Sequence, residues 1–274
     1  MRIFDQHLHS WNSFDCQTQP IDNVRRAIDV GLAGLTFTEH FDTHPTEWDG
    51  CVYDDAKIER EILKLREQFG DQIFIGKGIE VCYQPERMDF ILEFLAAHSF
   101  DVILLSLHWA SGRAVHVQDQ FANMSCDEYL RFYLKAMCDC TAHLVQMKRD
   151  GHQPFQILGH LDFAKRYAFR MFGFDGPLNE PKLVDAILQN CLDAGIIPEI
   201  NTSTLRQGLS SPMPGMEVVQ RYAKLGGMMM SFGSDSHRAD DIGAGADHAV
   251  KMMKDAGLTH LACFEEGQLR ATAL

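Results

Sequence analysis

Short apolar runs alternate along the chain with longer stretches in which apolar residues recur every three or four positions. The short runs are typical of buried strands, and the longer period is typical of amphipathic helices. Strands are expected at residues 2–6, 34–38, 73–81, 102–106, 156–159, 197–200 and 228–232. Helices are expected between and after them, at residues 23–30, 54–69, 88–97, 126–149, 180–194, 215–225 and 239–256.

This alternation of strands and helices, repeated seven times, predicts a parallel sheet covered by helices. Several expected helices end in glycine, and Gly195 and Gly226 lead straight into the next strand. No linker-like segment, low-complexity stretch or repeat divides the chain, so we expect a single domain over residues 1–274. Periodicity alone leaves both a closed barrel and an open doubly wound sheet possible.

Composition and charge narrow the class of protein. Of the 274 residues, 46% are hydrophobic, which allows a large core and argues against disorder. The formal net charge is −13, from 25 basic and 38 acidic residues, and it argues against binding nucleic acid or an anionic membrane. An anionic substrate would need positive charge within the site, which bound metal ions could supply.

The chain has no apolar run of signal-peptide length near its start and none long enough to span a membrane. Its eight cysteines are scattered and form no Cys-x-x-Cys pair, so we expect free thiols in a reducing compartment. These features together predict a cytoplasmic protein. They give no indication of its oligomeric state.

The expected strands all run into acidic, amide or imidazole side chains at their C-terminal ends. In chain order these are His7 and His9, Glu39 and His40, Glu80, His108, His160 and Asp162, Glu199 and Asn201, and Asp235 and His237. The active site of a barrel lies at the C-terminal rim of its strands, whereas an open sheet brings together only the strands beside its switch point. The pattern therefore favours a barrel with one shared site.

A single histidine at a strand end is more often structural than a metal ligand, but six histidines and at least two acids in this position are not independent accidents. Burying so many unpaired ionisable groups would be costly, and neutral imidazole is the commonest metal ligand. The candidates exceed the three or four protein ligands of one catalytic zinc, so more than one metal is expected. The other histidines are expected to be structural or exposed, with His44 and His116 as possible loop contacts near the rim.

Seven short motifs occur in order: DQHLHS (5–10), TEH (38–40), GIE (78–80), SLH (106–108), GHLD (159–162), EIN (199–201) and GSDSH (233–237). Together they resemble the polymerase and histidinol phosphatase (PHP) superfamily of metal-dependent phosphoesterases, over essentially the whole chain. The resemblance implies an α/β fold, a distorted, TIM-like (β/α)7 barrel. It also implies a trinuclear centre of divalent transition metals, which could be zinc, manganese or iron.

The resemblance further implies a role for each polar residue. One metal would be held by His7, His9, Glu80 and Asp235; Glu80 would bridge to a second with His108 and His160; a third would be held by His40, His237 and Asp15. Many relatives have histidine where this chain has Asp15, which is an acceptable oxygen ligand. Residues expected to orient imidazoles and metal waters are Asp5, Glu39, Asp162 and Asn201.

Chain length and two stretches, HLDFAKRY (160–167) and EINTSTLRQG (199–208), resemble the histidinol-phosphate phosphatase branch. Arg166 and Arg206 are the implied phosphate-binding residues, with Lys165 as the alternative to the first. The implied reaction is hydrolysis of L-histidinol phosphate, in histidine biosynthesis, by a hydroxide bridging two metals, without a covalent nucleophile. Asp42 or Glu47 could meet the cationic end of such a substrate.

Three other functions stay open. The same fold and metals could act on another small phosphoester or a nucleotide. A metal-dependent amidohydrolase also begins with His-x-His after its first strand, but Glu80, the Glu39-His40 doublet and the Ser-Asp-Ser-His ending fit that class poorly. A non-catalytic binding module is disfavoured because a decaying site would have lost some of its ligands.

Overall fold

The structure is a computed structural model, and it describes residues 1–46 and 51–274. Within them, seven parallel strands lie at the positions that the hydrophobic pattern predicts: β1 (Phe4–Leu8), β2 (Gly34–Phe41), β3 (Phe74–Cys82), β4 (Val102–Ser106), β7 (Ile157–Leu158), β8 (Ile197–Asn201) and β9 (Met229–Gly233). They are neighbours in this order. The α/β fold with a parallel sheet is therefore confirmed.

The first and last of these strands meet at their C-terminal ends. The main-chain N–H of Asp235 donates to the carbonyl oxygen of His7 at 2.7 Å, and the N–H of His9 donates to the carbonyl of Ser236 at 2.9 Å. Lower down, the side-chain amide of Gln6 makes two 2.9 Å hydrogen bonds to the main chain of Phe264 instead. The barrel is thus closed at the rim and opened below it by an additional strand; a distorted barrel was expected, but this cause of the distortion was not.

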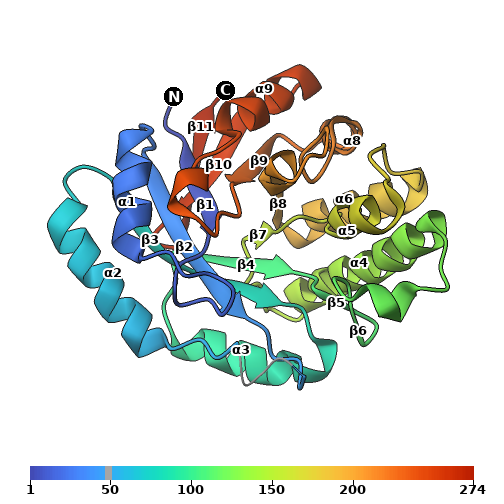
Figure 1. The fold of residues 1–274 in the computed structure, drawn as a ribbon, viewed down its shortest axis with the longest axis horizontal. Coiled ribbons are helices and arrows are strands. Elements are labelled where there is room, and N and C mark those ends of the chain that lie inside the picture. Colours follow the sequence, from blue (N-terminus) through green and yellow to red (C-terminus); the bar gives the residue numbers. More distant parts are fainter. Residues whose placement is uncertain (47–50) are drawn as a thin grey trace.

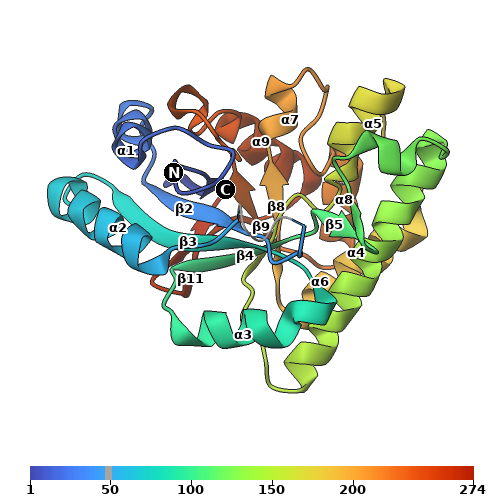
Figure 2. The same ribbon diagram turned by 60° about the horizontal axis from the view of Figure 1, so that its bottom comes forward.

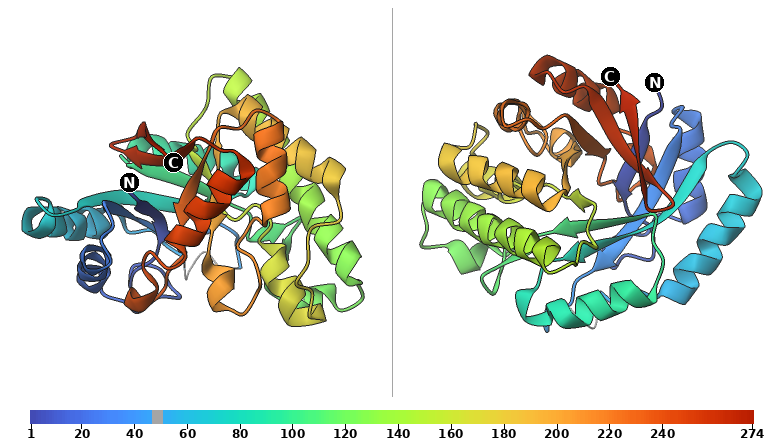
Figure 3. Two further views of the ribbon diagram at one scale, coloured as in Figure 1. Left: turned by 90° about the horizontal axis from the view of Figure 1, so that it is seen from above. Right: turned by 180° about the vertical axis from the view of Figure 1, so that it is seen from behind.

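That additional strand is β10 (His260–Glu265), and β11 (Gln268–Ala273) pairs with it in antiparallel register. Neither strand was predicted. Their turn places Glu266 and Gly267 at φ 53° and 71°, without the Asn-Gly or Asp-Gly pair that usually signals such a hairpin. The hairpin brings the two chain ends together, with an Arg2–Glu265 ion pair at 3.1 Å (Figures 1 and 3).

Helices form an outer layer around the strands (Figure 1). They are α1 (Pro20–Asp29), α2 (Asp55–Phe69), α3 (Met88–Ala97), α4 (Cys126–Arg149), α5 (Ala164–Phe172), α6 (Pro181–Ala194), α7 (Ser203–Arg206), α8 (Met216–Lys224) and α9 (Ala246–Ala256). The last was predicted to begin at residue 239, but Gly243 and Gly245, at φ 70° and 82°, delay its start. In the described part of the chain, no helix combines the length and apolar character needed to cross a membrane.

Short elements that the hydrophobic pattern missed stand at the C-terminal rim. A hairpin of β5 (Trp109–Ala110) and β6 (Arg113–Ala114) follows β4, α5 follows β7, and α7 follows β8. Figure 2 shows α5 and α7 beyond the arrowhead of β8. The strand ends and these rim segments together surround the candidate site.

Candidate metal centre

A cavity of about 340 Å³ opens at the C-terminal rim of the barrel. Residues from five of the strand ends and from the loop after β1 share it: Asp15, His40, Glu80, His108, His160, Asp235 and His237 line its wall. His7 and His9 lie beneath this layer and are fully buried. The structure thus brings together all nine residues that the sequence selects as metal ligands.

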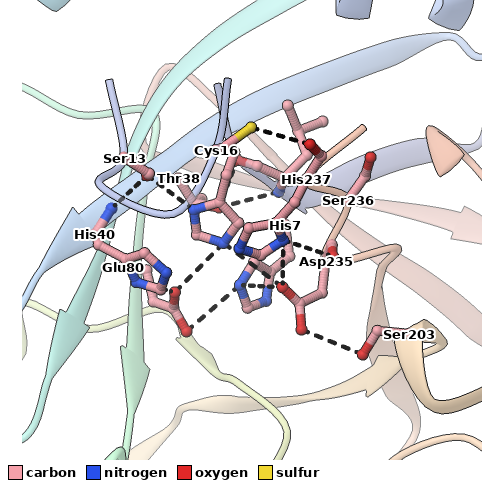
Figure 4. A network of polar contacts seen from close by, with 12 residues as sticks. His7, Ser13, Cys16, Thr38, His40, Glu80, Ser203, Asp235, Ser236 and His237 are labelled. Carbon is pink, nitrogen blue, oxygen red and sulfur yellow. Dashed lines mark hydrogen bonds and ion pairs between the residues drawn. The ribbon is translucent and has the colours of Figure 1, made fainter. Parts of the chain in front are cut away.

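Glu80, near the end of β3, is the centre of the cluster. Its Oε1 lies 3.0 Å from His160 Nε2, 3.3 Å from His108 Nε2 and 3.4 Å from His7 Nε2. Its Oε2 lies 2.9 Å from His40 Nδ1 and 3.5 Å from His9 Nε2. One carboxylate therefore faces five imidazoles, and Figure 4 shows it beside His40 and His7.

Asp235 supplies a second carboxylate, two residues beyond β9. Its Oδ1 lies 3.6 Å from His9 Nε2, 3.7 Å from His237 Nδ1 and 3.9 Å from His7 Nε2. Its main chain has φ 51°, in the left-handed region that non-glycine residues seldom adopt. The hydrogen bond from its N–H to His7 holds this conformation and aims the carboxylate into the cavity.

Asp15 forms a third, more exposed corner. Its Oδ2 lies 3.0 Å from His237 Nε2 and 3.5 Å from His40 Nε2. The side chains of Asp15 and His237 are 37% and 30% exposed, whereas that of Glu80 is 1% exposed. This corner is open to the cavity mouth.

Burial and the close packing of charges shift the pKa values of the residues in the cluster. Burial would raise the pKa of Glu80, but His7, His108 and His40 hold it well below its usual range. Burial, reinforced by His40 and His237, lowers the pKa of His9 to about 3. The cluster therefore pairs an ionised carboxylate, Glu80, with a neutral imidazole, His9, while nearby carboxylates hold the pKa of His7, His40 and His108 well above its usual range.

Several inward-facing atoms lack a hydrogen bond. The buried atoms His7 Nε2 and His9 Nε2 have no hydrogen-bond partner in the described residues, and His40 Nδ1 and Glu80 Oε2 meet each other at 2.9 Å without the geometry of a hydrogen bond. Buried polar atoms are normally paired, so unpaired ones need an explanation. Triads of these residues have ligand atoms within 4.8 Å of one another, among them His7–His9–Glu80 and His40–Glu80–His108. The donor set and its unpaired atoms fit a multinuclear metal site.

Glu199, on β8, holds His7 from behind. Its Oε1 accepts from His7 Nδ1 at 2.8 Å, and its Oε2 accepts from the main-chain N–H of His160 at 2.9 Å. A Cβ at Gly233 would lie 2.0 Å from Glu199 Oε1, so glycine is required there. Glu199 was recognised as a strand-end acid but given no role. Its place two residues before Asn201, on the same face of the strand, was the signal that it belongs to the site.

Glu39 and Asn201 contact the cluster through intermediates. Glu39 accepts from the hydroxyls of Ser10 and Ser13, and Ser13 Oγ lies 3.1 Å from His9 Nδ1. Asn201 donates to Glu199 Oε2 at 3.2 Å. Both side chains therefore orient groups that orient imidazoles.

Asp5 and Asp162, predicted for the same role, take other positions. Asp5 accepts from the main-chain N–H groups of Ser234 and Gly243, each at 2.9 Å, and so anchors the loop that carries Asp235. Asp162 is buried, and neither of its oxygens has a hydrogen-bond partner in the described residues. Burial raises its pKa to about 7 against the opposing charge of Lys165.

Asp42 contacts His108 at the edge of the cavity. Its Oδ2 lies 3.1 Å from His108 Nδ1, which directs the other ring nitrogen toward Glu80. Its Oδ1 is buried. Asp42 is thus a partner of His108, a role for which the sequence gave no signal; it also lines the cavity, and its contact with the cationic end of a substrate stays a prediction. Glu47, the other residue considered for the substrate's cationic end, lies outside the described residues.

The predicted phosphate-binding arginines occupy different depths. Arg166 lines the cavity, and its Nη2 donates to Asp235 Oδ2 at 2.7 Å. Arg206 does not line it; its Nη2 donates to the main-chain carbonyls of Ser234 and Asp235 at 2.8 and 3.3 Å. Lys165 is buried and donates to Ser211 Oγ at 2.5 Å, away from the cavity.

The two histidines that were expected near the rim, His44 and His116, lie in different places. His116 lines the cavity. His44 stacks on Trp109, with ring centres 3.4 Å apart, and lines a different hollow.

Known proteins resemble this chain both in sequence and in fold. Residues 5–203 match the PHP domain. The chain is 30% identical over 267 residues to a probable histidinol-phosphatase of Clostridium acetobutylicum, covering 93% of this chain and 94% of that protein. The chain is a PHP domain protein of the histidinol-phosphatase family. The family expected from the motifs is thereby confirmed.

Two further comparisons, one of sequence and one of structure, cover nearly all of this chain. It is 27% identical to a histidinol-phosphatase of Lactococcus lactis, covering 96% of this chain and 95% of the relative. The crystal structure of the Lactococcus lactis histidinol phosphate phosphatase, complexed with zinc, L-histidinol and phosphate, superposes with a TM-score of 0.85 at 24% identity, covering 98% and 99% of the two chains. The superposition shows that the two proteins share one fold.

Proposed function

We propose that the protein is a histidinol-phosphatase, which hydrolyses L-histidinol phosphate to L-histidinol and inorganic phosphate. The observation that carries the proposal is the buried cluster around Glu80, with five imidazole nitrogens within 3.5 Å of one carboxylate. It occurs in a chain whose full-length relatives bear this activity in their names. The Lactococcus lactis structure, which holds histidinol and phosphate, supports a small phosphorylated substrate.

In this proposal three divalent metal ions are held by nine side chains. His7, His9, Glu80 and Asp235 bind one ion, Glu80 with His108 and His160 a second, and Asp15 with His40 and His237 a third. Mixed nitrogen and oxygen ligation suits zinc, manganese or iron, and zinc is present in the Lactococcus lactis relative. Glu199, Asp42 and Ser13 fix the orientation of His7, His108 and His9.

When bound, the ions supply Lewis acidity, which lowers the pKa of water and neutralises charge on phosphoryl oxygens. The chain's own residues provide the rest of the environment. Among the proposed ligands Asp15, Glu80 and Asp235 carry three negative charges, so three divalent ions would leave this ligand set positively charged and able to attract a phosphate despite the net charge of −13. Arg166, held against Asp235, adds a positive charge on the cavity wall.

The test is a substrate panel on the purified, metal-loaded protein. We expect about three tightly bound transition metals and faster phosphate release from histidinol phosphate than from nucleoside monophosphates, sugar phosphates or an aryl phosphate. Three metals with a strong preference for another ester would keep the metal centre and reject the substrate. Fewer than two bound metals, with no hydrolysis after metal addition, would reject both.

A further inference from the structure

Helix α5 presents three side chains to the cavity. Arg166, Tyr167 and Arg170 all line it. Arg166 and Arg170 are four residues apart, so they lie side by side, one turn from each other, on the same face of the helix. Helix α5 stands at the rim beyond the end of β8 (Figure 2), and Arg170 is the exposed member of the three, whereas Arg166 and Tyr167 are partly buried.

The two arginines that sequence similarity selected are already engaged with the protein. Arg166 Nη2 donates both to Asp235 Oδ2, at 2.7 Å, and to Ser203 Oγ, at 2.5 Å. Arg206 donates to two main-chain carbonyls, and its Nε lies 3.4 Å from Asp241 Oδ2. Both guanidinium groups therefore brace the loop that carries Asp235.

Arg170 differs from both. Its Nη2 donates to the amide oxygen of Gln207 at 3.0 Å, and its Cζ lies 5.2 Å from the centre of the Tyr167 ring. Among the described residues, no carboxylate oxygen lies within 4 Å of Arg170. A neutral acceptor and an aromatic face hold this cation in place without neutralising it, in a chain with a large excess of acidic residues.

From this placement we propose that Arg170 binds the phosphoryl group of the entering substrate, and the departing phosphate product, at the outer end of the cavity, before and after that group lies against the metal ions. The inference rests on the proposed function, because it assumes a phosphate ester as substrate. A guanidinium binds phosphate oxygens with charge-assisted hydrogen bonds, and exposed Arg170 loses little hydration in doing so. The same charge repels the ammonium end of a histidinol-like substrate, so it also fixes the direction in which the substrate enters.

Four variants of the metal-loaded protein test this role. Arg170→Gln removes the charge, and Arg170→Lys keeps it without the planar fork. Gln207→Ala removes the hydrogen bond to Arg170 but leaves its charge. Arg149→Gln makes the same charge change on the exposed end of α4, away from the cavity. For each variant, kcat and KM for histidinol phosphate and the Kd of inorganic phosphate by calorimetry are measured.

Arg170→Gln is expected to raise both KM and the phosphate Kd about threefold to fivefold, with kcat within about twofold of the parent, since an exposed charge pair is worth at most about a factor of five in affinity. Arg170→Lys should recover part of this loss, Gln207→Ala, which removes a group that positions Arg170, should show a smaller defect than Arg170→Gln, and Arg149→Gln should change KM less than twofold. An unchanged phosphate Kd in Arg170→Gln, or an Arg149→Gln enzyme with the same defect, would overturn the proposal. Phosphate binding that depends on Arg170 in a protein inactive on histidinol phosphate would reject the proposed substrate and leave the role of Arg170 intact.

Discussion

Replacing Glu199 by glutamine tests whether the cluster depends on the tautomer of His7. The carboxylate of Glu199 accepts three hydrogen bonds, from His7 Nδ1, from the N–H of His160 and from the amide of Asn201. A glutamine has one oxygen fewer, and the main-chain N–H of His160 always requires an acceptor. The amide nitrogen would therefore face His7 Nδ1, so the His7 proton would have to move to Nε2, the atom that faces Glu80.

The expected loss of metal affinity follows from this change in the tautomer of His7. A protonated Nε2 cannot bind a metal ion, and loss of such an orienting carboxylate typically lowers metal affinity by about 10- to 100-fold. At about 1.4 kcal/mol per factor of ten, the loss is about 1.4 to 2.8 kcal/mol of binding free energy. Glu199→Ala would in addition leave the N–H of His160 unpaired in a buried position. This unpaired donor should lower the free energy of unfolding of the protein by about 1 to 3 kcal/mol.

The assay is metal content after equilibration in metal buffers of known free concentration, alongside turnover of histidinol phosphate. Glu199→Gln should lose one ion at concentrations where the parent retains all of them. Glu217→Gln is the matched control, because Glu217 accepts a main-chain N–H of Leu178 and contacts no imidazole among the described residues. A Glu199→Gln protein with the parent's metal affinity would refute the argument from the tautomer.

Four further outcomes are expected. A chelator strong enough to strip the cluster should abolish hydrolysis and lower the melting temperature, since buried imidazoles and carboxylates would lose their partners; an unchanged melting curve would contradict a structural contribution of the metals. Gly233→Ala should reduce both metal content and the free energy of unfolding, because its Cβ would meet Glu199 Oε1 and His7 Cβ. A variant with the parent's metal content and stability would show that β9 can shift to make room for the methyl group. Asp15→Asn should weaken one ion and leave the others bound, because Asp15 contacts only His40 and His237 of the cluster; loss of every ion would contradict a separate third corner. Ser125→Ala should lower the free energy of unfolding by about 1 kcal/mol without altering kcat, because it removes the capping box of α4; denaturant titration and steady-state kinetics check both parts.

The barrel strands and the metal cluster were predictable because both depend on short-range patterns. Short apolar runs and period-3.6 hydrophobicity identify the elements, and parallel strands carry their C-terminal residues to one rim, which brings His7, Glu80 and Asp235 together. The shapes of the loops were not predictable. Whether Arg206 reaches the cavity or binds the main chain of Ser234 depends on how α7 packs beyond β8, which no periodicity records.

The same limit explains the remaining differences. Asp42 and Arg170 become meaningful only when His108 and the cavity wall are located in space. The strands β10 and β11 escaped notice because their turn contains Glu266 in place of a residue that favours positive φ. Local rules predict elements and rim residues, whereas contacts made by tertiary packing require the fold itself.

The junction of β1 with the loop after β9 has a consequence for the order of assembly. Asp235 and its partners His7 and His9 stand at opposite ends of the chain, and the hydrogen bonds that join them close a loop of more than 200 residues. A chain emerging from the ribosome presents its two histidines first and cannot pair them with Asp235 until its last barrel strand has been made. During synthesis the growing polypeptide therefore carries an incomplete set of metal ligands, and we expect full metal loading to wait until Asp235 and His237 have left the exit tunnel.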